Sequence, residues 1–259
     1  MSLINAIVVS VGIIVSYFLF FFFVGTRIKN NSIVDMGWGA GFVIPTVILY
    51  FFTAGTDPQF LLMFFVSFWG LRLTYYLIKR NWGQPEDFRY KLWRRQWKDK
   101  AVINAFVRVY VLQAFIMIMV GLPVFLFMSD SSNTIVFNPW SFVAIGLYFL
   151  GLAFEAIGDS QLKEHRKSGA KDVITSGLWA YTRHPNYFGN SALWFGITLF
   201  VIIHQPSLWW TFISPVVMSG ILYFISTPIL ERRMQKKPGW EEYAARTSMF
   251  IPWFPKENV

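Results

Sequence analysis

The sequence contains no cysteine, few charged residues and three histidines. Without cysteine the chain forms no disulfide, binds no metal through thiolates and has no cysteine nucleophile. The histidines, His165, His184 and His204, lack the spacing of metal ligands, so no metal site is expected. Charged residues make up 14% of the 259 residues, whereas soluble domains carry about 25%. These shortages exclude disulfide-rich, zinc-binding and ordinary soluble proteins.

Hydrophobic residues account for 55% of the chain and aromatic residues for 20%. Apolar runs of about 20 residues, enough to cross a hydrocarbon core about 30 Å thick, recur without a visible repeat or linker. The first run lacks a basic N-terminal flank and a cleavage site, so we expect it to be retained as a helix. The pattern predicts an all-α integral membrane protein with one domain, residues 1–259, and seven transmembrane helices at 3–24, 33–54, 59–78, 104–128, 137–158, 187–204 and 208–230.

Lysine and arginine are confined to alternate connections between these runs. The first, third and fifth connections and the C-terminal tail are basic, with Arg27 and Lys29, then Lys79 through Lys100, then Lys163 through Arg183, then Arg232 onward. The other connections contain only Asp57 and Asp130 as charged residues. The positive-inside rule therefore predicts an external N-terminus and a cytoplasmic C-terminus. The net charge of +9 follows from this topology and from attraction to lipid headgroups, so no nucleic-acid partner is expected.

The segment from Gly177 to Gly189, GLWAYTRHPNYFG, places polar side chains where a membrane helix begins. Polar groups such as Arg183 and Asn186 are costly at this depth without a partner, which favours a functional site. The alternative is an ordinary helix N-terminus, with Pro185 in the first turn and aromatic residues in the interfacial belt. The residues themselves leave both interpretations open.

Other polar side chains lie within or beside the expected spans. Arg72 lies inside the third span, where it is either functional or long enough to reach the cytoplasmic face. Asp35 begins the second span, either as a functional acid or as a helix N-cap. Glu155 and Asp159 share one helix face, either as acceptors for ribose or amide groups or in an exposed ladder with Lys163.

Motifs along nearly the whole chain resemble one family. They are Asp35-x-x-Trp38-Gly39, Leu71-Arg72-Leu73, Arg80-Asn81, Glu86-Asp87-x-Arg89-Tyr90, Asp159-x-Gln161, Gly177-Leu178-Trp179, Arg183-His184-Pro185-Asn186-Tyr187-x-Gly189 and Thr247-x-x-Phe250-Ile251-Pro252. In this order they resemble the bacterial relatives of the steroid 5-alpha-reductases, membrane reductases of the DUF1295 type. The resemblance implies a seven-helix NADPH-dependent enzyme, with substrate-side helices in residues 1–130 and mainly cofactor binding in residues 131–259.

The resemblance also implies the site residues. Those at the NADPH cofactor would be Arg72, Asn81, Asp159, Leu162, Arg166, Arg183, His184, Asn186, Tyr187, Asn190, Trp194, Glu231, Arg232 and Arg233, with the arginines at its phosphates. The catalytic candidates are Asp35, Trp38, Trp69 and Tyr76. The steroid enzymes use a glutamate in the second helix and a tyrosine in the third, where this chain has Asp35 and Trp69. They also have a glutamate where Asn190 stands.

The implied chemistry is reduction of a carbon–carbon double bond conjugated to a ketone. NADPH gives a hydride to the β-carbon, and a donor polarises the carbonyl oxygen. A buried Asp35 that stays protonated is a candidate donor. The aromatic content favours a broad apolar pocket for a steroid or another enone lipid. We expect a monomer among membrane lipids, in the inner membrane of a bacterium or the endoplasmic reticulum membrane of a eukaryote.

Two other functions fit part of the sequence. Membrane methyltransferases of the isoprenylcysteine and phospholipid type share the Arg-His-Pro-x-Tyr-x-Gly signature and bind S-adenosylmethionine. The motifs of the N-terminal half and the seven-helix length favour the reductase over them. A small transporter or lipid-binding protein is the other alternative, but transporters usually contain paired repeats, and none is visible here.

Overall fold

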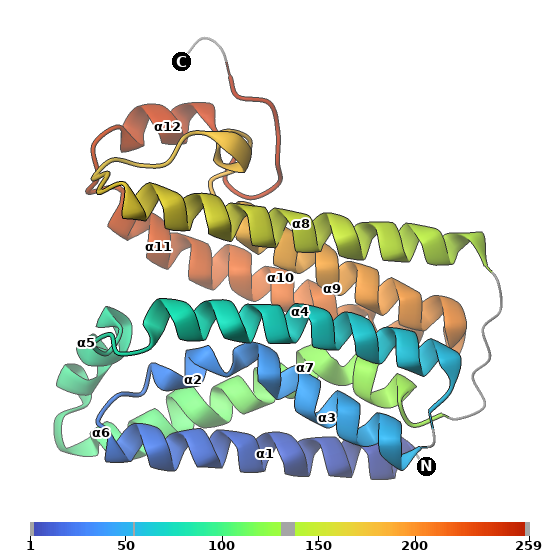
Figure 1. The fold of residues 1–259 in the computed structure, drawn as a ribbon. Coiled ribbons are helices and arrows are strands. Elements are labelled where there is room, and N and C mark those ends of the chain that lie inside the picture. Colours follow the sequence, from blue (N-terminus) through green and yellow to red (C-terminus); the bar gives the residue numbers. More distant parts are fainter. Residues whose placement is uncertain (1–2, 54, 131–137, 257–259) are drawn as a thin grey trace. The chain divides into compact units, whose positions relative to one another are not determined.

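The computed structural model describes residues 3–53, 55–130 and 138–256, and every regular element among them is a helix (Figure 1). The all-α prediction is therefore confirmed. The chain forms two compact units. The first unit comprises Met1–Val136 with His204–Trp209, and the second comprises Phe137–Ile203 with Trp210–Val259. The single-domain organisation stays a prediction.

The first unit consists of long helices joined by short turns. Its α-helices are α1 (Leu3–Arg27), α2 (Ile33–Met36), α3 (Trp38–Phe52), α4 (Asp57–Asn81), α5 (Phe88–Trp97), α6 (Ala101–Ala105) and α7 (Leu112–Phe127). At the start of α4 the Thr56 amide donates to the Gln59 side-chain oxygen at 2.9 Å, which satisfies one amide that the helix leaves unpaired. Helices α1 and α4 extend the expected spans at 3–24 and 59–78 into the flanking polar residues.

The second expected span, 33–54, is broken at Gly37, where α2 ends and α3 begins. A break in apolar surroundings is tolerated only if the local backbone groups find other partners. The Tyr17 hydroxyl donates to the Gly37 carbonyl at 2.7 Å, and the Ala40 amide donates to the Thr74 hydroxyl at 2.8 Å. Side chains from α1 and α4 therefore stabilise the break.

The fourth helical segment begins well before the expected residue 104. Helical residues run from Phe88 to Phe127 through the 3₁₀ turn η1 (Lys98–Lys100) and the π-helix η2 (Phe106–Val111). The backbone turns at Lys98, whose φ of +46° is uncommon for a residue other than glycine. The interpretation of Lys79 through Lys100 as a connection was therefore incomplete, because it contains helix α5.

The second unit contains the C-terminal helices. They are α8 (Pro139–Lys167), η3 (Gly177–Ala180), α9 (Pro185–His204), α10 (Ile213–Gly220), the π-helix η5 (Ile221–Ser226), α11 (Thr227–Met234) and α12 (Trp240–Arg246). The turn η4 (Pro206–Phe212) connects α9 to α10, and its residues up to Trp209 belong to the first unit. Helix α8 continues past the expected end at 158, so Glu155 and Asp159 lie on one continuous helix, as predicted. The expected start of this span at 137 lies outside the described residues.

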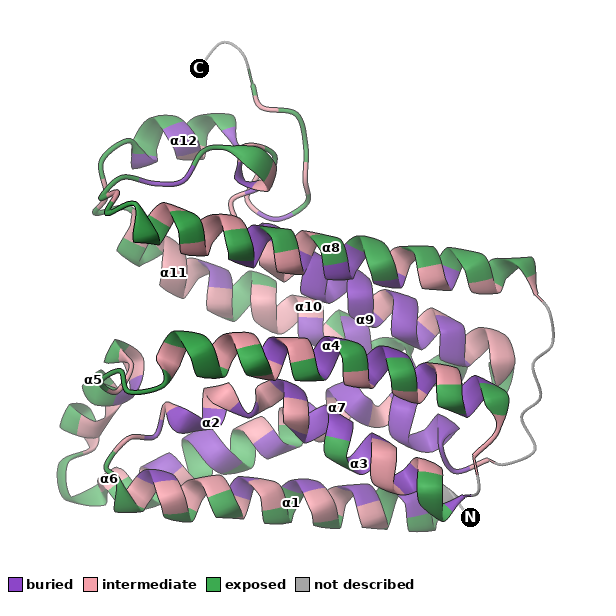
Figure 2. Ribbon diagram, viewed as in Figure 1, coloured by how far each residue is buried: buried purple, intermediate pink, exposed green. Residues whose placement is uncertain are grey.

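Helices α8 and α9 pack main chain against main chain because glycines line their contact. A Cβ atom on Gly151 would meet the main chain of Gly189 and Leu193. A Cβ atom on Gly196 would likewise meet the main chain of Tyr148. Small residues allow such close approach between membrane helices, whose association depends on van der Waals packing. Accordingly, α9 is buried along most of its length (Figure 2).

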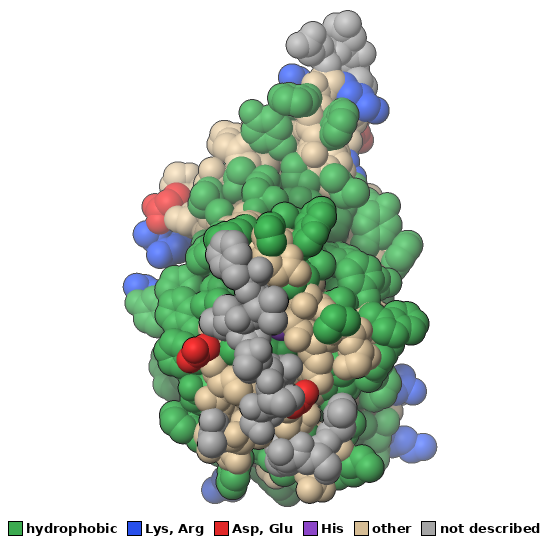
Figure 3. Space-filling view, turned by 90° about the vertical axis from the view of Figure 1, so that its right-hand side faces the viewer, with side chains coloured by type: hydrophobic (Ala, Val, Ile, Leu, Met, Phe, Trp, Pro, Cys, Tyr) green, Lys and Arg blue, Asp and Glu red, His purple; other side chains and the backbone are tan. Residues whose placement is uncertain are grey.

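Six helical segments of the described residues are long and apolar enough to cross a membrane: Ile4–Arg27, Asp57–Asn81, Phe88–Phe127, Pro139–Lys167, Pro185–His204 and Pro206–Met234. The remaining expected span corresponds to α3, which has 15 residues and is therefore about 23 Å long. Hydrophobic side chains make up much of the surface visible in Figure 3. These features indicate an integral membrane protein, and the count of seven spans stays a prediction.

The glycine contact between α8 and α9 gives the first testable prediction. Gly151→Ala should lower the melting temperature, because its methyl group meets the α9 main chain and overpacking costs about 1–3 kcal/mol. Gly146→Ala on the same helix is the control, because its added Cβ has no atom within 4 Å. Thermal unfolding of the detergent-purified variants, followed by tryptophan fluorescence, measures both. Equal melting temperatures for the two variants would contradict the close packing.

Candidate functional site

Two carboxylates and two amides pair between α8 and α9. The Asn186 amide nitrogen donates to Asp159 Oδ1 at 3.2 Å. The Asn190 amide nitrogen donates to Glu155 Oε2 at 3.3 Å. One helical turn separates the two pairs on each helix, so they lie above one another. Glu155, Asp159 and Asn190 are buried, and these four residues are termed the polar ladder.

Helix α9 also contains buried polar atoms at the polar ladder and in the residues that follow it. Asn190 Oδ1, Ser191 Oγ and Thr198 Oγ1 have no hydrogen-bond partner within the part of the chain that the structure describes. Such atoms are rare, because a buried donor or acceptor without a partner costs about 1–3 kcal/mol.

Arg183 lies just before α9 and joins it to the C-terminal part of the chain. Its Nε donates to Glu231 Oε1 at 2.7 Å, and its Nη1 donates to the carbonyls of Ala244 and Thr247 at 2.7 and 2.9 Å. The side chains of Arg183 and Glu231 are only 11% and 15% exposed. Three protein acceptors thus hold the guanidinium, which gives Arg183 a structural role that the sequence did not indicate. Its role as a phosphate ligand stays a prediction.

His184 and Tyr187 belong to the same junction. His184 Nε2 lies 3.4 Å from Glu231 Oε1, and the His184 ring stacks on Tyr187 with centroids 5.3 Å apart and planes inclined by 11°. The His184 amide donates to the Thr182 hydroxyl at 3.3 Å. The predicted cofactor residues Arg183, His184 and Glu231 therefore contact one another. The segment is a helix N-terminus, as one interpretation expected, and its polar side chains are paired within the protein. A functional site at this segment stays a prediction.

Residues 172–184 and 240–256 form a small cap beside the ends of α8 and α11. Val173, Trp240 and Tyr243 pack together in its apolar core. The Tyr243 hydroxyl donates to the Trp179 carbonyl at 2.8 Å, and burial raises the pKa of that hydroxyl. The Trp179 indole nitrogen donates to the Gly158 carbonyl of α8 at 3.1 Å. These bonds fasten the cap to the helix that carries the polar ladder.

The other residues expected at the cofactor are distributed over both units. In the second unit Arg166, Arg232 and Arg233 are exposed near the C-terminal ends of α8 and α11, Leu162 is half-buried, and Trp194 is fully buried in α9. Arg72 and Asn81 belong to the first unit. No group of three or more potential metal ligands occurs among the described residues.

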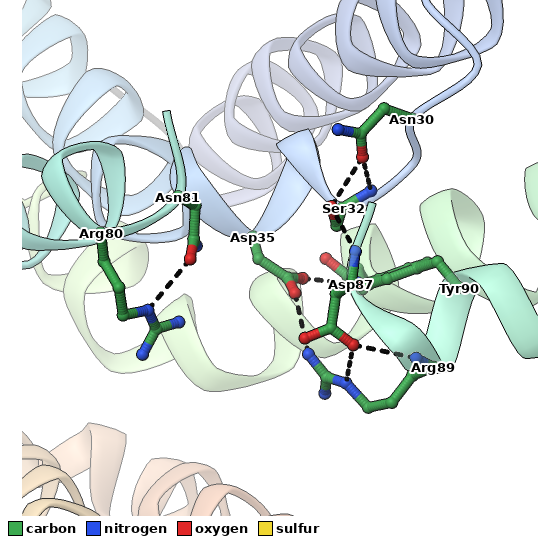
Figure 4. Close-up of polar contacts among 9 residues, drawn as sticks. Asn30, Ser32, Asp35, Arg80, Asn81, Asp87, Arg89 and Tyr90 are labelled. Carbon is green, nitrogen blue, oxygen red and sulfur yellow. Dashed lines mark hydrogen bonds and ion pairs between the residues drawn. The ribbon is translucent and has the colours of Figure 1, made fainter. Parts of the chain in front are cut away.

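In the first unit the Asp35 carboxylate accepts hydrogen bonds from Arg89 and Tyr90, which lie 54 and 55 residues further along the sequence (Figure 4). Arg89 Nη2 donates to Asp35 Oδ2 at 3.1 Å, and the Tyr90 hydroxyl donates to Oδ1 at 2.7 Å. Because both oxygens accept hydrogen bonds, the geometry matches an ionised carboxylate. Protonated Asp35 as a donor stays a prediction.

A second acid–arginine pair lies in the same unit. Arg94 donates to both carboxylate oxygens of Glu86, at 2.7 and 3.2 Å. The main-chain amide of Asn31 donates to Glu86 Oε1 at 2.8 Å. The Tyr110 hydroxyl donates to the Asn31 side-chain oxygen at 3.1 Å. Sequence reasoning missed Arg94 and Tyr110, because no spacing rule relates them to the acids. The only signal in the sequence was the presence of both charge signs in this stretch.

The tryptophans expected to be catalytic pack in the interior of the first unit. Trp38 and Trp69 both contact Phe42, each with ring centroids 5.7 Å apart. Trp69 is fully buried. Their visible contribution is therefore aromatic packing between α3 and α4, and a catalytic role for them stays a prediction.

The last turns of α4 carry three of the expected site residues. Arg72 is half-buried, and the Arg80 guanidinium lies 5.6 Å from the centre of the Tyr76 ring. Arg80 Nε donates to the Asn81 side-chain oxygen at 3.1 Å (Figure 4). The structure thus brings Tyr76 and Asn81 together through Arg80, which was not among the expected site residues.

The junction at Arg183 gives the second prediction. Arg183→Met should destabilise the protein by about 3 kcal/mol, because it leaves the Glu231 carboxylate without its arginine in a largely buried place. The double variant with Glu231→Gln should recover part of this loss, because no charge then remains unpaired. Arg246→Met is the control, since its pair with Glu242 is exposed and worth under about 1 kcal/mol. Equal melting temperatures for Arg183→Met and Arg246→Met would show that the contacts of Arg183 do not stabilise the fold.

Comparisons with known proteins place the chain in a family. The profile of the family described as "Protein of unknown function (DUF1295)" matches residues 21–247. The chain is also similar to an uncharacterized protein of Schizosaccharomyces pombe, with 24% identity over 93% of this chain and 79% of the yeast protein. No solved structure matches. Because the family profile covers most of the chain, the protein belongs to the DUF1295 family.

Proposed function

We propose that the protein is a membrane-embedded, NADPH-dependent reductase of an enone double bond, related to the steroid 5-alpha-reductases. The polar ladder is the observation that supports this most. Two buried carboxylates between apolar helices are costly and mark function. Carboxylate and amide oxygens are acceptors for the hydroxyls of a ribose and the amide of a nicotinamide. Asn190 Oδ1, Ser191 Oγ and Thr198 Oγ1 would add three buried polar atoms that lack a hydrogen-bond partner within the described residues.

The phosphates of the cofactor require cations, and the second unit has them near the ends of its helices. Arg166, Arg232 and Arg233 are exposed there, and guanidinium groups match phosphate oxygens in a fork. These arginines would hold the 2′-phosphate that distinguishes NADPH from NADH. Arg183 would act on phosphate binding indirectly, by holding Glu231 and the cap in place. The cofactor itself supplies the hydride.

The reaction also needs a group that stabilises charge on the substrate carbonyl. In the first unit the Tyr90 hydroxyl donates to Asp35 Oδ1 at an oxygen–oxygen distance of 2.7 Å. Gln113 Nε2 donates to the same hydroxyl at 3.1 Å, which fixes its direction. When the substrate binds, this hydroxyl would turn its one proton from Asp35 to the carbonyl oxygen that becomes negative in the transition state. Asp35 would hold Tyr90 in place before the substrate binds, and water would return the proton that Tyr90 gives up. The substrate would be a steroid or another lipophilic enone.

The membrane arrangement follows from the same proposal. Helix α3 would complete seven spans, with the N-terminus outside and the C-terminus in the cytoplasm, because the basic residues lie in alternate connections. The protein would be a monomer in the inner membrane of a bacterium or the endoplasmic reticulum membrane of a eukaryote.

Ligand-dependent melting tests the cofactor. NADPH at 100 times its Kd should stabilise the purified protein by about 2.7 kcal/mol, NADH should act more weakly, and S-adenosylmethionine should have no effect. Asp159→Asn and Arg232→Gln should each reduce the response to NADPH, the latter without changing the response to NADH. Lys167→Gln is the control, because Lys167 forms an exposed pair with Glu164 on α8. Stabilisation by S-adenosylmethionine alone would show a methyltransferase instead.

Asp35→Asn tests the catalytic assignment. It should reduce turnover of a 3-oxo-4-ene steroid by at least tenfold while NADPH binding stays the same, because a neutral amide no longer forms the ion pair with Arg89 and holds the Tyr90 hydroxyl less strongly. Asp87→Asn is the matched control, since Asp87 is the other carboxylate on Arg89 at 3.0 Å. The loss of NADPH absorbance reports turnover. Full activity of Asp35→Asn would remove this residue from the mechanism.

A further inference from the structure

The last described segment of the chain exposes large apolar side chains. Ile251, Trp253 and Phe254 are 67%, 72% and 76% exposed, and they are termed the apolar trio. Adjacent exposed side chains of this size and type indicate a surface that contacts an apolar partner. The cofactor and substrate assigned above do not use them.

The backbone that carries the apolar trio is fixed. The Thr182 hydroxyl donates to the Phe250 carbonyl at 2.9 Å, and the Trp253 amide donates to the Tyr181 carbonyl at 2.9 Å. The Lys256 amide donates to the Arg246 carbonyl at 3.0 Å. These three hydrogen bonds tie the segment to the rest of the cap. The outward direction of the apolar trio is therefore built into the cap.

The start of this segment contacts a membrane helix. Phe250 is largely buried and packs edge-on against Tyr223 of η5, with ring centroids 5.5 Å apart. Tyr223 belongs to the apolar segment Pro206–Met234 and lies eight residues before Glu231, or about 12 Å along the helix. The chain thus returns from α12 to a part of the helix that is expected within the bilayer. The apolar trio follows directly.

The composition of the segment suits the membrane interface. Pro252 and Pro255 flank the aromatic pair and carry no amide proton, so fewer backbone donors need a partner where water is scarce. Tryptophan is enriched at the level of the lipid headgroups. Arg246 and Lys256 lie beside the apolar trio in the cap, and Lys236 and Lys237 precede α12. These cations complement anionic phospholipid headgroups, whereas the same surface on a second copy would repel them.

We propose that the apolar trio is an interfacial anchor, which inserts into the headgroup region of an anionic phospholipid leaflet. The anchor holds the cap against the membrane. Because Thr182 binds Phe250 and the Arg183 amide donates to the Ser248 carbonyl at 2.8 Å, this contact with lipid directly supports the junction at Arg183. The proposal does not depend on the reductase activity.

The absence of cysteine makes a direct test possible, because one introduced thiol is labelled selectively. Ile251→Cys and Trp253→Cys, each carrying an environment-sensitive fluorophore, are reconstituted in nanodiscs of phosphatidylcholine with or without phosphatidylglycerol. Glu241→Cys, exposed on α12 of the same cap, is the control. Quenching by lipids with brominated chains reports contact with the bilayer, and quenching by aqueous iodide reports contact with water.

Labels at 251 and 253 should be quenched by brominated lipid at least twofold more than the label at 241 and should be protected from iodide. Phosphatidylglycerol should increase this difference, and Lys256→Gln should reduce the increase. Labels at 251 and 253 that are open to iodide would overturn the anchor. Labels protected from iodide without lipid quenching would show that protein covers the surface, which also overturns it. The same quenching with and without phosphatidylglycerol would overturn the role of anionic headgroups.

Discussion

The second unit depends on the ion pair between Arg183 and Glu231. Its arginine comes from the turn before α9, its glutamate from α11, and its further acceptors from the main chain at Ala244 and Thr247, at the end of α12. One guanidinium can join three segments because its donors point in several fixed directions, which a lysine cannot reproduce. The position of the cap relative to α9 therefore depends on the contacts of this one side chain. The polar ladder begins one turn further along that helix.

In the first unit, several hydrogen bonds from side chains stabilise the polar groups within the apolar helices. Its second apolar segment is interrupted at Gly37, and the Tyr17 hydroxyl donates to the carbonyl there. Just before the break, Asp35 receives bonds from residues of α5. In both units, polar groups within the apolar helices are met by side chains from distant parts of the sequence. This common rule connects the helix break, the acid–arginine pairs and the polar ladder.

The helices could be predicted largely from the sequence, because apolar runs near bilayer length are typical of membrane-spanning helices. The face shared by Glu155 and Asp159 was also predictable, since it depends only on helical periodicity. Helix α5 was not predicted, because its basic and aromatic residues do not repeat in an apolar pattern. The partners of Asp35 were missed because tertiary packing brings them together. The acceptors at Ala244 and Thr247 were also missed, since they are carbonyl oxygens that every residue possesses.

If α3 is the seventh span, as proposed above, its shortness has a consequence for the surrounding lipid. At about 23 Å, α3 is shorter than a hydrocarbon core of about 30 Å. Such hydrophobic mismatch is relieved by thinning of the bilayer around the short helix, at a fraction of a kcal/mol per Å. Lipids with shorter chains would reduce this deformation. Membrane thickness would then influence the helix break at Gly37, and through it the place of Asp35 at the start of the helix.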